Sequence, residues 1–587
     1  MVAHRLLALW LLTVPCPLAV SGLLAATGAA QSADGASSSQ PLLPRGAYDV
    51  GFRSTWTLDE GRTYRTAWDD GATYGTDKSP RPVLVLEWYP ALAAPAGAPR
   101  HEDEPGAAHD AAHDAAHDQP PRMPHGAYFD IVPAEPRLAA LAGALREHAY
   151  GIFVEEVMGA PVAELDATQR AELERVLAAP TACRRGAEPA PGPFPLVVYH
   201  AGAGSSFEDN AALCEFLASQ GYVVLGSAFL RADGSQLGID AGRGSAEDCQ
   251  CLLRWAHAQP GVDAGRFALV GHSAGAQAFL KFAAQPGCGA EALVLLDTTE
   301  DYYALSMPLH EALVRETSEN VAQLTLPMLV AASPEAYFQL CDTFVHAERL
   351  YVTVPGLGHE EFISQGHQRL DRLLRSTGGP GVAPGEDDAA DIARAPAAHA
   401  TYRALCATVL AFLDARLRGD GGALAARIEA DRARPWTHED LRLASVPRGA
   451  DGPAPWDPAS DDPPTPRQFV RLLRDQGVDP ACAALARFRE RQPRGPLYTS
   501  TMLAGSQLFD LSEHGRLDDA RRYLAALKEI PLRPLGLFQF LADISGMQGR
   551  PAEARRLLRL ACDLDPEDEE LAASLRTLEA PAAGNAR

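Results

Sequence analysis

The sequence predicts an α/β fold, a doubly wound and mostly parallel sheet, followed by an all-α domain of helical repeats. From Phe194 onward, short apolar segments alternate regularly with helical patterns, the order expected of parallel strands joined by right-handed helical crossovers. Several of these strands are continuous apolar runs, as in sheets that helices cover on both faces. After about residue 466 only helical patterns remain, and they recur at a fixed period. A chain of 587 residues exceeds one hydrophobic core, so at least two folded units are expected.

The first thirty residues have the pattern of a secretory signal peptide. A basic start precedes an apolar stretch over residues 6–26, and small residues at 28–30 offer a cleavage site. The alternative is an uncleaved anchor, because the stretch is nearly long enough to span a bilayer, but Pro15 and Pro17 interrupt it. We therefore expect an exported protein, periplasmic or secreted, with a disordered leader over 31–45 and no membrane-spanning segment after cleavage.

The net charge argues against a nucleic-acid partner, and the cysteine spacing argues against structural zinc. The net charge is −24, from 52 basic and 76 acidic residues, so the surface repels phosphate backbones and nucleic acid is not expected as a partner. Of ten cysteines, Cys16 lies in the signal region, where the preceding Pro15 disfavours lipidation. The remaining nine form no recognisable disulfide framework, and no CxxC pair indicates structural zinc.

A histidine repeat lies in a low-complexity stretch. The tetrad AAHD occurs three times over 107–118, which spaces His109, His113 and His117 four residues apart. On a helix they would share one face, as a metal site requires. The exact repetition and the flanking prolines favour a disordered insertion instead. No metal and no cofactor is therefore predicted.

The individual elements follow in chain order. One strand is predicted at 81–90, before an insertion over 91–190 that holds two helical patterns between 136 and 178. The later strands are expected at 195–200, 221–229, 266–271, 292–297, 326–333 and 349–356, with helices at 207–219, 245–258 and 274–285. A Gly/Pro/Ala-rich loop is expected over 376–398, and an amphipathic helix at 400–417 closes a domain of residues 46–418.

A linker over 419–465 is predicted next, from its dense Gly, Pro and Asp residues, and helical repeats over 466–580. Gly515-Arg516 recurs 34 residues later as Gly549-Arg550, and Leu524 recurs as Leu558. That period is typical of tetratricopeptide repeats, which are pairs of antiparallel helices. A third pair is expected at 466–492. Fewer than three clear repeats give a free solenoid only marginal stability. We therefore expect them to pack on the preceding domain or on a protein partner.

The segment Gly271-His272-Ser273-Ala274-Gly275 is the most specific chemical signal. It follows the apolar strand FALVG and precedes the helical stretch AQAFLKFAAQ, which is the context that a GxSxG nucleophile turn requires. The glycines leave room for close backbone approach, and the helix N-terminus favours a developing negative charge near the serine. Ser273 is the predicted nucleophile.

A serine nucleophile needs a base, and the base needs an acid that orients it. His359 lies in the loop directly after the strand RLYVTVPG, whereas His346 precedes that strand and His367 lies in a helical pattern. The expected chain order is Ser, acid, His. Asp297, at the end of ALVLLD, is therefore the favoured acid, and Glu335, just after LPMLVAAS, is its rival.

An oxyanion hole requires two backbone donors. One is expected from the amide of Ala274, the residue after the nucleophile. The other is expected from the glycine-rich stretch after the strand PLVVY, where we name Gly202.

Together these residues resemble the platelet-activating-factor acetylhydrolase and dienelactone-hydrolase-like branch of the α/β-hydrolases. The resemblance is carried by Gly46 with YDVG (48–51), by RPVLVLEWYP (81–90), YHAGAG (199–204), GHSAG (271–275), LLD (295–297), GLGHEEF (356–362) and AFLDARL (411–417). It implies an α/β-hydrolase fold, no cofactor, Asp297 rather than Glu335 as the acid, and short-acyl or phospholipid-type esters as substrates. The stretch HAGAG departs from the family's usual HG pair, and the insertion changes the rim of the pocket, which leaves the substrate class open.

The sequence thus predicts a serine hydrolase that cleaves a carboxylic ester, a small molecule or a lipid. Two alternatives stay open. The chain could act chiefly as an interaction protein that binds a partner through its helical repeats, or the same triad could cleave an amide or peptide bond.

Overall fold

The computed structural model describes residues 42–66, 78–93, 120–232, 243–306, 311–376, 386–434, 441–450, 452, 456, 464–491, 501–527, 533–547 and 549–579. The predicted signal peptide, most of the predicted leader and the histidine repeat lie outside these residues. Within them no helix is both long and apolar enough to span a bilayer. All nine cysteines of the described part are free thiols.

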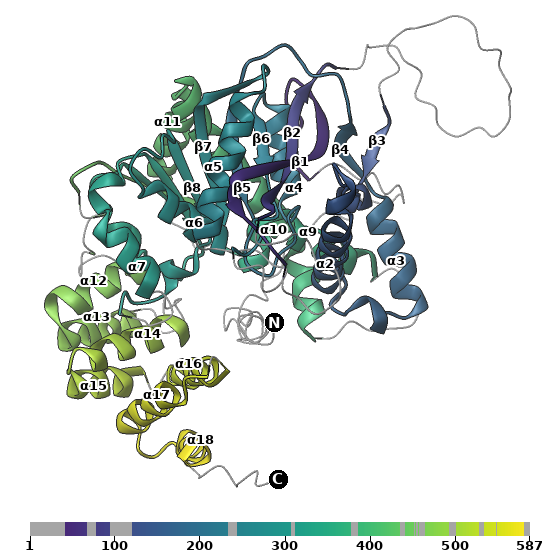
Figure 1. Cartoon of the computed structure of the whole chain (residues 1–587). Coiled ribbons are helices and arrows are strands. Elements are labelled where there is room, and N and C mark those ends of the chain that lie inside the picture. The colour runs from purple at the N-terminus through teal and green to yellow at the C-terminus, as the bar shows by residue number, and fades with distance from the viewer. Residues whose placement is uncertain are drawn as a thin grey trace, which may run out of the picture.

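An eleven-stranded sheet forms the centre of the molecule, and its middle is parallel (Figure 1). The strand order is β11-β10-β9-β8-β7-β5-β6-β2-β1-β4-β3, and β5 to β10 run parallel to one another. The strands are β1 Asp49–Thr63, β2 Pro80–Ala91, β3 Arg122–Pro124, β4 Pro180–Arg185, β5 Phe194–His200, β6 Val223–Gly226, β7 Val262–His272, β8 Ala292–Leu296, β9 Met328–Ala332, β10 Arg349–Thr353 and β11 Arg442–Val446. Strand β5 is a topological switch point: β6 lies on one side of it and β7 on the other, so the strand order reverses there. Ligands of such sheets bind beyond the carboxyl ends of the strands at this point.

Helices cover both faces of the sheet, which explains the uninterrupted apolar strands. In β5, Val197 and Tyr199 belong to one buried cluster, whereas Leu196 and Val198 belong to the other. The first cluster includes α2 Ala139–Met158, α4 Ala211–Ser219, α9 Ser364–Ser376 and α10 Glu386–Leu413. The second includes α5 Arg243–His257, α6 Ala274–Ala283 and α7 Glu311–Glu319. A mostly parallel, doubly covered sheet is therefore present, as the sequence predicts.

The insertion between β2 and β5 contains both helices and strands in its described part. Its described part holds α2 and α3 Ala167–Ala178, at the two predicted helical patterns, together with the short strands β3 and β4. Helix α2 packs against α9 and contributes Leu141, Leu145 and Phe153 to the first cluster. The insertion thus belongs to the core of the sheet domain.

Three predicted boundaries differ from the structure. The loop expected over 376–398 becomes helix from residue 386, because buried Ala395 and Ala398 pack on the core and outweigh the break that Pro396 favours. The linker expected over 419–465 contains α11 Gly422–Ala433 and the edge strand β11, which pairs antiparallel with β10. Backbone pairing needs few apolar side chains, so composition did not reveal β11. In the expected leader, Leu43 is buried.

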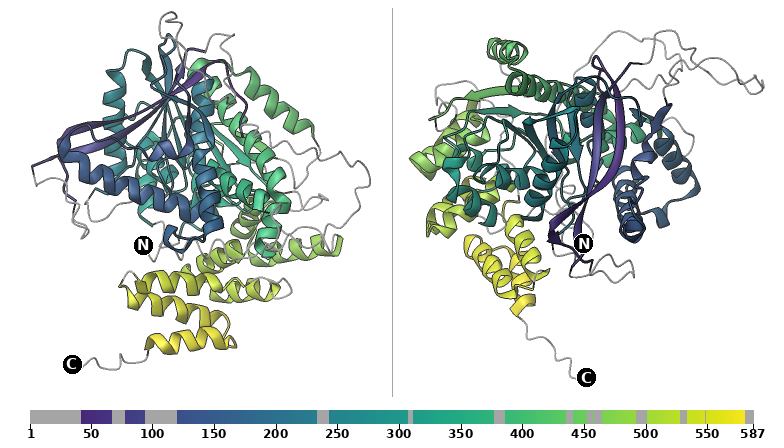
Figure 2. Two further views of the ribbon diagram at one scale, coloured as in Figure 1. Left: turned by 90° about the vertical axis from the view of Figure 1, so that its right-hand side faces the viewer. Right: turned by 45° about the horizontal axis from the view of Figure 1, so that its top comes forward.

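The C-terminal region consists of helical hairpins stacked below the sheet domain (Figures 1 and 2). Its helices are α12 Pro466–Gln476, α13 Val478–Arg491, α14 Thr501–Glu513, α15 Leu517–Leu527, α16 Gly536–Met547, α17 Pro551–Leu564 and α18 Glu569–Glu579. The turns at Gly515 and Gly549 both have φ of 72°, and α14 and α16 end 34 residues apart. The sequence period thus corresponds to a repeated hairpin.

Candidate functional site

Ser273 lies on a strained turn between β7 and α6. Its backbone has φ 51° and ψ −119°, a conformation that non-glycine residues adopt rarely and at a cost. A Cβ on Gly271 would lie 2.5 Å from the carbonyl carbon of Gly275, and a Cβ on Gly275 would lie 2.3 Å from the carbonyl oxygen of His200. Both positions therefore require glycine. The amide of Ser273 donates to Leu296 O at 3.0 Å, which ties the turn to the end of β8.

The structure brings Ser273, His359 and Asp297 into one hydrogen-bonded chain. His359 Nε2 lies 3.0 Å from Ser273 Oγ, and His359 Nδ1 lies 2.6 Å from Asp297 Oδ2. Asp297 directly follows β8 with φ 48°, a second strained position, and His359 begins a 3-10 turn after β10. It is thus Asp297, and not the rival Glu335, that contacts the imidazole.

The other two histidines near this strand lie elsewhere. His346 is exposed, whereas His367 is buried and its Nε2 lies 2.9 Å from Glu361 O.

Opposing effects set the pKa of His359. Burial by itself lowers it, but the hydrogen bond and the negative charge of Asp297 outweigh burial, and the charges of Glu360 and Glu156 add to them. The result is a pKa raised to about 9. Burial and the neighbouring His359 hold the pKa of His272 well below its usual value, and the ring centroids of the two histidines lie 4.7 Å apart. The site therefore favours positive charge on His359 and not on His272.

The predicted oxyanion donors have different surroundings. Ala274 is buried at the first position of α6, directly after Ser273. A Cβ on Gly202 would lie 3.3 Å from Ser273 Cβ, so this stretch borders the nucleophile turn. The amide of Gly202, however, donates to Asp209 Oδ2 at 3.3 Å, and Tyr199 donates to the other oxygen at 2.7 Å. The Gly202 amide is thus already engaged by a buried carboxylate, which sequence reasoning did not anticipate.

Tyr302 is the main site residue that the sequence does not reveal. Its hydroxyl donates to Asp297 Oδ1, so both carboxylate oxygens of Asp297 are engaged. The same hydroxyl accepts from the amide of Ser333 at 2.8 Å. No motif marks this tyrosine, and the nearest signal is only that it follows the predicted acid by five residues.

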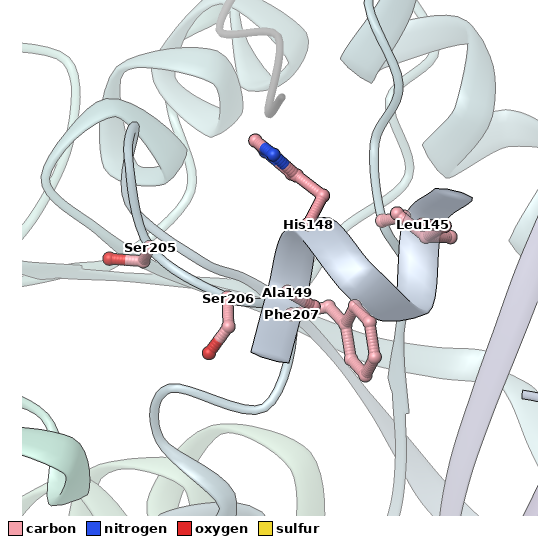
Figure 3. A pocket seen from close by; sticks show the side chains of 7 residues that line it. Leu145, His148, Ala149, Ser205, Ser206 and Phe207 are labelled. Atoms are coloured by element: carbon pink, nitrogen blue, oxygen red, sulfur yellow. The ribbon is translucent and has the colours of Figure 1, made fainter. Parts of the chain in front are cut away.

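A cavity lies between helix α2 and the glycine-rich stretch after β5 (Figure 3). It is small, with room for about one water molecule, is partly open to solvent, and is lined by Leu145, His148, Ala149, Ser205, Ser206, Phe207 and Ala228. Figure 3 shows His148, Leu145 and Ala149 on one helix, with Ser205 and Ser206 on the adjoining loop. Ser205 Oγ would lie 3.4 Å from a Cβ on Gly202, so this wall adjoins the nucleophile turn. The lining is mostly apolar, with a few polar groups.

Among the described residues no cluster of His, Cys, Asp and Glu has the arrangement of a metal site. The histidine repeat of His109, His113 and His117 lies outside those residues.

The chain matches no family model and no curated protein. Among solved structures it is similar to a ferulic acid esterase from Streptomyces cinnamoneus, with 20% identity and a TM-score of 0.40. The alignment covers 69% of this chain and 98% of the esterase. At that degree of likeness, the chemistry of this chain has to be argued from its own residues.

Proposed function

We propose that this protein is a serine hydrolase of the α/β-hydrolase type that cleaves a carboxylic ester through an acyl-enzyme intermediate. The observation that carries the proposal is the hydrogen-bonded chain from Ser273 Oγ through His359 to Asp297. The strained serine turn and the place of the site at the carboxyl ends of parallel strands support it. The predicted signal peptide extends the proposal to an exported enzyme.

The proposed reaction has two stages. Ser273 Oγ attacks the ester carbonyl while His359 Nε2 takes its proton, and His359 then returns this proton to the leaving alcohol. Water, deprotonated by the same imidazole, cleaves the acyl-enzyme. Asp297 holds the imidazole by its Nδ1–H and stabilises the positive charge that forms there.

The tetrahedral oxygen needs donors in this reaction. The amide of Ala274 is the first. The amide of Gly202 can supply the second, either by turning away from Asp209 toward the substrate or by sharing its hydrogen between the two. Burial raises the pKa of Asp209 to about 7, so the anion that holds this amide is itself disfavoured.

The first test is covalent labelling. We expect a fluorophosphonate probe to label the native protein at one site, and mass spectrometry to find the adduct on the peptide that contains Ser273, because only a serine with an adjacent base reacts readily. The Ser273→Ala variant and heat-unfolded protein should stay unlabelled. Equal labelling of the native and unfolded protein, or of the variant, would contradict the proposal.

The cavity beside α2 points to a short acyl group. Leu145 lines it, whereas Leu141, one helical turn earlier, is equally buried in the same cluster without lining it. We expect Leu145→Ala to raise kcat/KM for the hexanoyl relative to the acetyl p-nitrophenyl ester by at least about tenfold, since accommodating a single additional methylene is worth about that much. Leu141→Ala is the matched control: both changes lower Tm, but only the first should change the acyl preference. An unchanged ratio in Leu145→Ala would place the acyl group elsewhere.

A further inference from the structure

The carboxylate of Asp297 is held from two sides. His359 occupies one oxygen and the Tyr302 hydroxyl the other, while the Ser333 amide fixes that hydroxyl from behind. The backbone of Asp297 has φ of 48°, and such a conformation persists only where the surrounding structure determines it. Without Tyr302, Asp297 Oδ1 would lose its donor and the carboxylate could rotate.

Tyr302 lies between two hydrophobic cores. Its ring packs against the second cluster of the sheet domain and also against the cluster of the C-terminal helices. The next two residues, Tyr303 and Ala304, are buried within the C-terminal cluster. The segment that carries Tyr302 is therefore a shared part of both domains.

Ser506 on α14 ties this segment down. Its hydroxyl accepts from the amide of Ala304 at 2.5 Å and lies 2.8 Å from the hydroxyl of Tyr337, and Ser506 is fully buried. The amide of Tyr337 in turn donates to Asp301 O at 2.9 Å, which closes a loop of bonds around Tyr302. Ser306 adds a bond to Asp510 Oδ1 at 2.6 Å. Helix α14 thus fixes the backbone on the C-terminal side of Tyr302.

A second contact holds the two domains together near the same place. The guanidinium of Arg467 on α12 pairs with Asp342 and lies 4.0 Å from the ring centroid of Tyr351 on β10. Arg467 is buried, so its charge is taken out of water where the two domains meet and is compensated there by Asp342.

We propose that Tyr302 is a positioning residue for Asp297, and that the C-terminal helices act on the active site by holding Tyr302 through Ser506. The inference rests on the proposed function, because it gives Asp297 its role there. It makes the helical region a structural part of the active site and not only a surface for a partner.

The first experiment uses Tyr302→Phe in the full chain. We expect kcat on a short p-nitrophenyl ester to fall about tenfold with KM unchanged, as for loss of one hydrogen bond to a charged group. Tyr222→Phe is the matched control, because Tyr222 is also buried and also donates to an aspartate, Asp414 at 2.7 Å, away from the site. It should lower stability without changing kcat. Equal kcat in Tyr302→Phe and the native protein would overturn the proposal.

The second experiment tests the route through Ser506. Ser506→Ala should lower kcat about threefold, whereas Ser512→Ala on the same helix, whose hydroxyl donates to Leu508 O within that helix, should not. If Ser506 acts through Tyr302, Ser506→Ala has no further effect on kcat in the Tyr302→Phe background and its full effect in the Tyr222→Phe background. Additive effects in both backgrounds would refute the route.

A third measurement needs no turnover. NMR titration of the His359 imidazole, assigned with His359→Gln, reports the surroundings of Asp297 directly. Tyr302→Phe should lower this pKa, because a carboxylate that is free to rotate holds the Nδ1–H less well and the hydrogen bond that raises the pKa weakens, while Glu360, Glu156 and His272 stay in place around the ring. An unchanged pKa would sink the positioning role. If the native protein lacks esterase activity but the shift appears, the proposed function has failed and the contact is real.

Discussion

Replacing Ser273 by alanine is expected to abolish ester hydrolysis, lowering kcat on a short p-nitrophenyl ester by about 10⁴-fold or more. The change removes the only nucleophile in the proposed mechanism and leaves the base without a proton to take, so what remains is the activity of the binding site alone. Initial rates at saturating ester, with enzyme concentration taken from absorbance, give the comparison.

The variant should fold normally. Ser273 is half-buried and its strained backbone costs alanine about as much as serine, so the free energy of unfolding should change by less than about 1 kcal/mol. Ser512→Ala, a similar deletion far from the site, controls for surface effects. Turnover of Ser273→Ala within tenfold of the native rate, in a preparation free of other esterases, would show that another group carries the reaction.

The sequence predicts the central sheet well, because the features that determine it are local and repeated. Apolar runs of five or six residues separated by helical patterns leave few other ways to bury both faces of a sheet. The turn at Ser273 was equally readable, since its geometry requires glycines at 271 and 275. These are properties of a few adjacent residues.

Contacts between distant segments were much harder to predict. Asp297 and Glu335 both follow apolar strands, and only the folded chain shows which of them meets His359. The position of Tyr302 beside Asp297 depends on packing against the C-terminal helices, and no local sequence pattern indicates that packing. The engagement of the Gly202 amide by Asp209 depends on how a loop folds back on itself. Such pairings are selected by tertiary packing, which leaves little trace in composition or periodicity.

The second large effect is expected from Asp297→Asn, which should lower kcat by about 10⁴-fold. Asparagine keeps the size of the side chain but removes the negative charge that stabilises the imidazolium, and its amide can stabilise the wrong tautomer of His359. Glu335→Gln is the matched control, the same carboxyl-to-amide change at the rival position. Loss of activity in Glu335→Gln with retention in Asp297→Asn would reverse the assignment of the acid.

The pH profile of Asp297→Asn gives a readout that misfolding cannot imitate. His359 accepts a proton only when neutral, so kcat/KM of the native protein should rise with pH until it levels off above the pKa of about 9 that Asp297 sustains against burial. Without the carboxylate, the hydrogen bond and charge that raise this pKa are lost and burial, which lowers it, remains. The residual activity of the variant should therefore level off at lower pH than that of the native protein. A profile that keeps its position on the pH axis would mean that Asp297 does not set the charge state of His359.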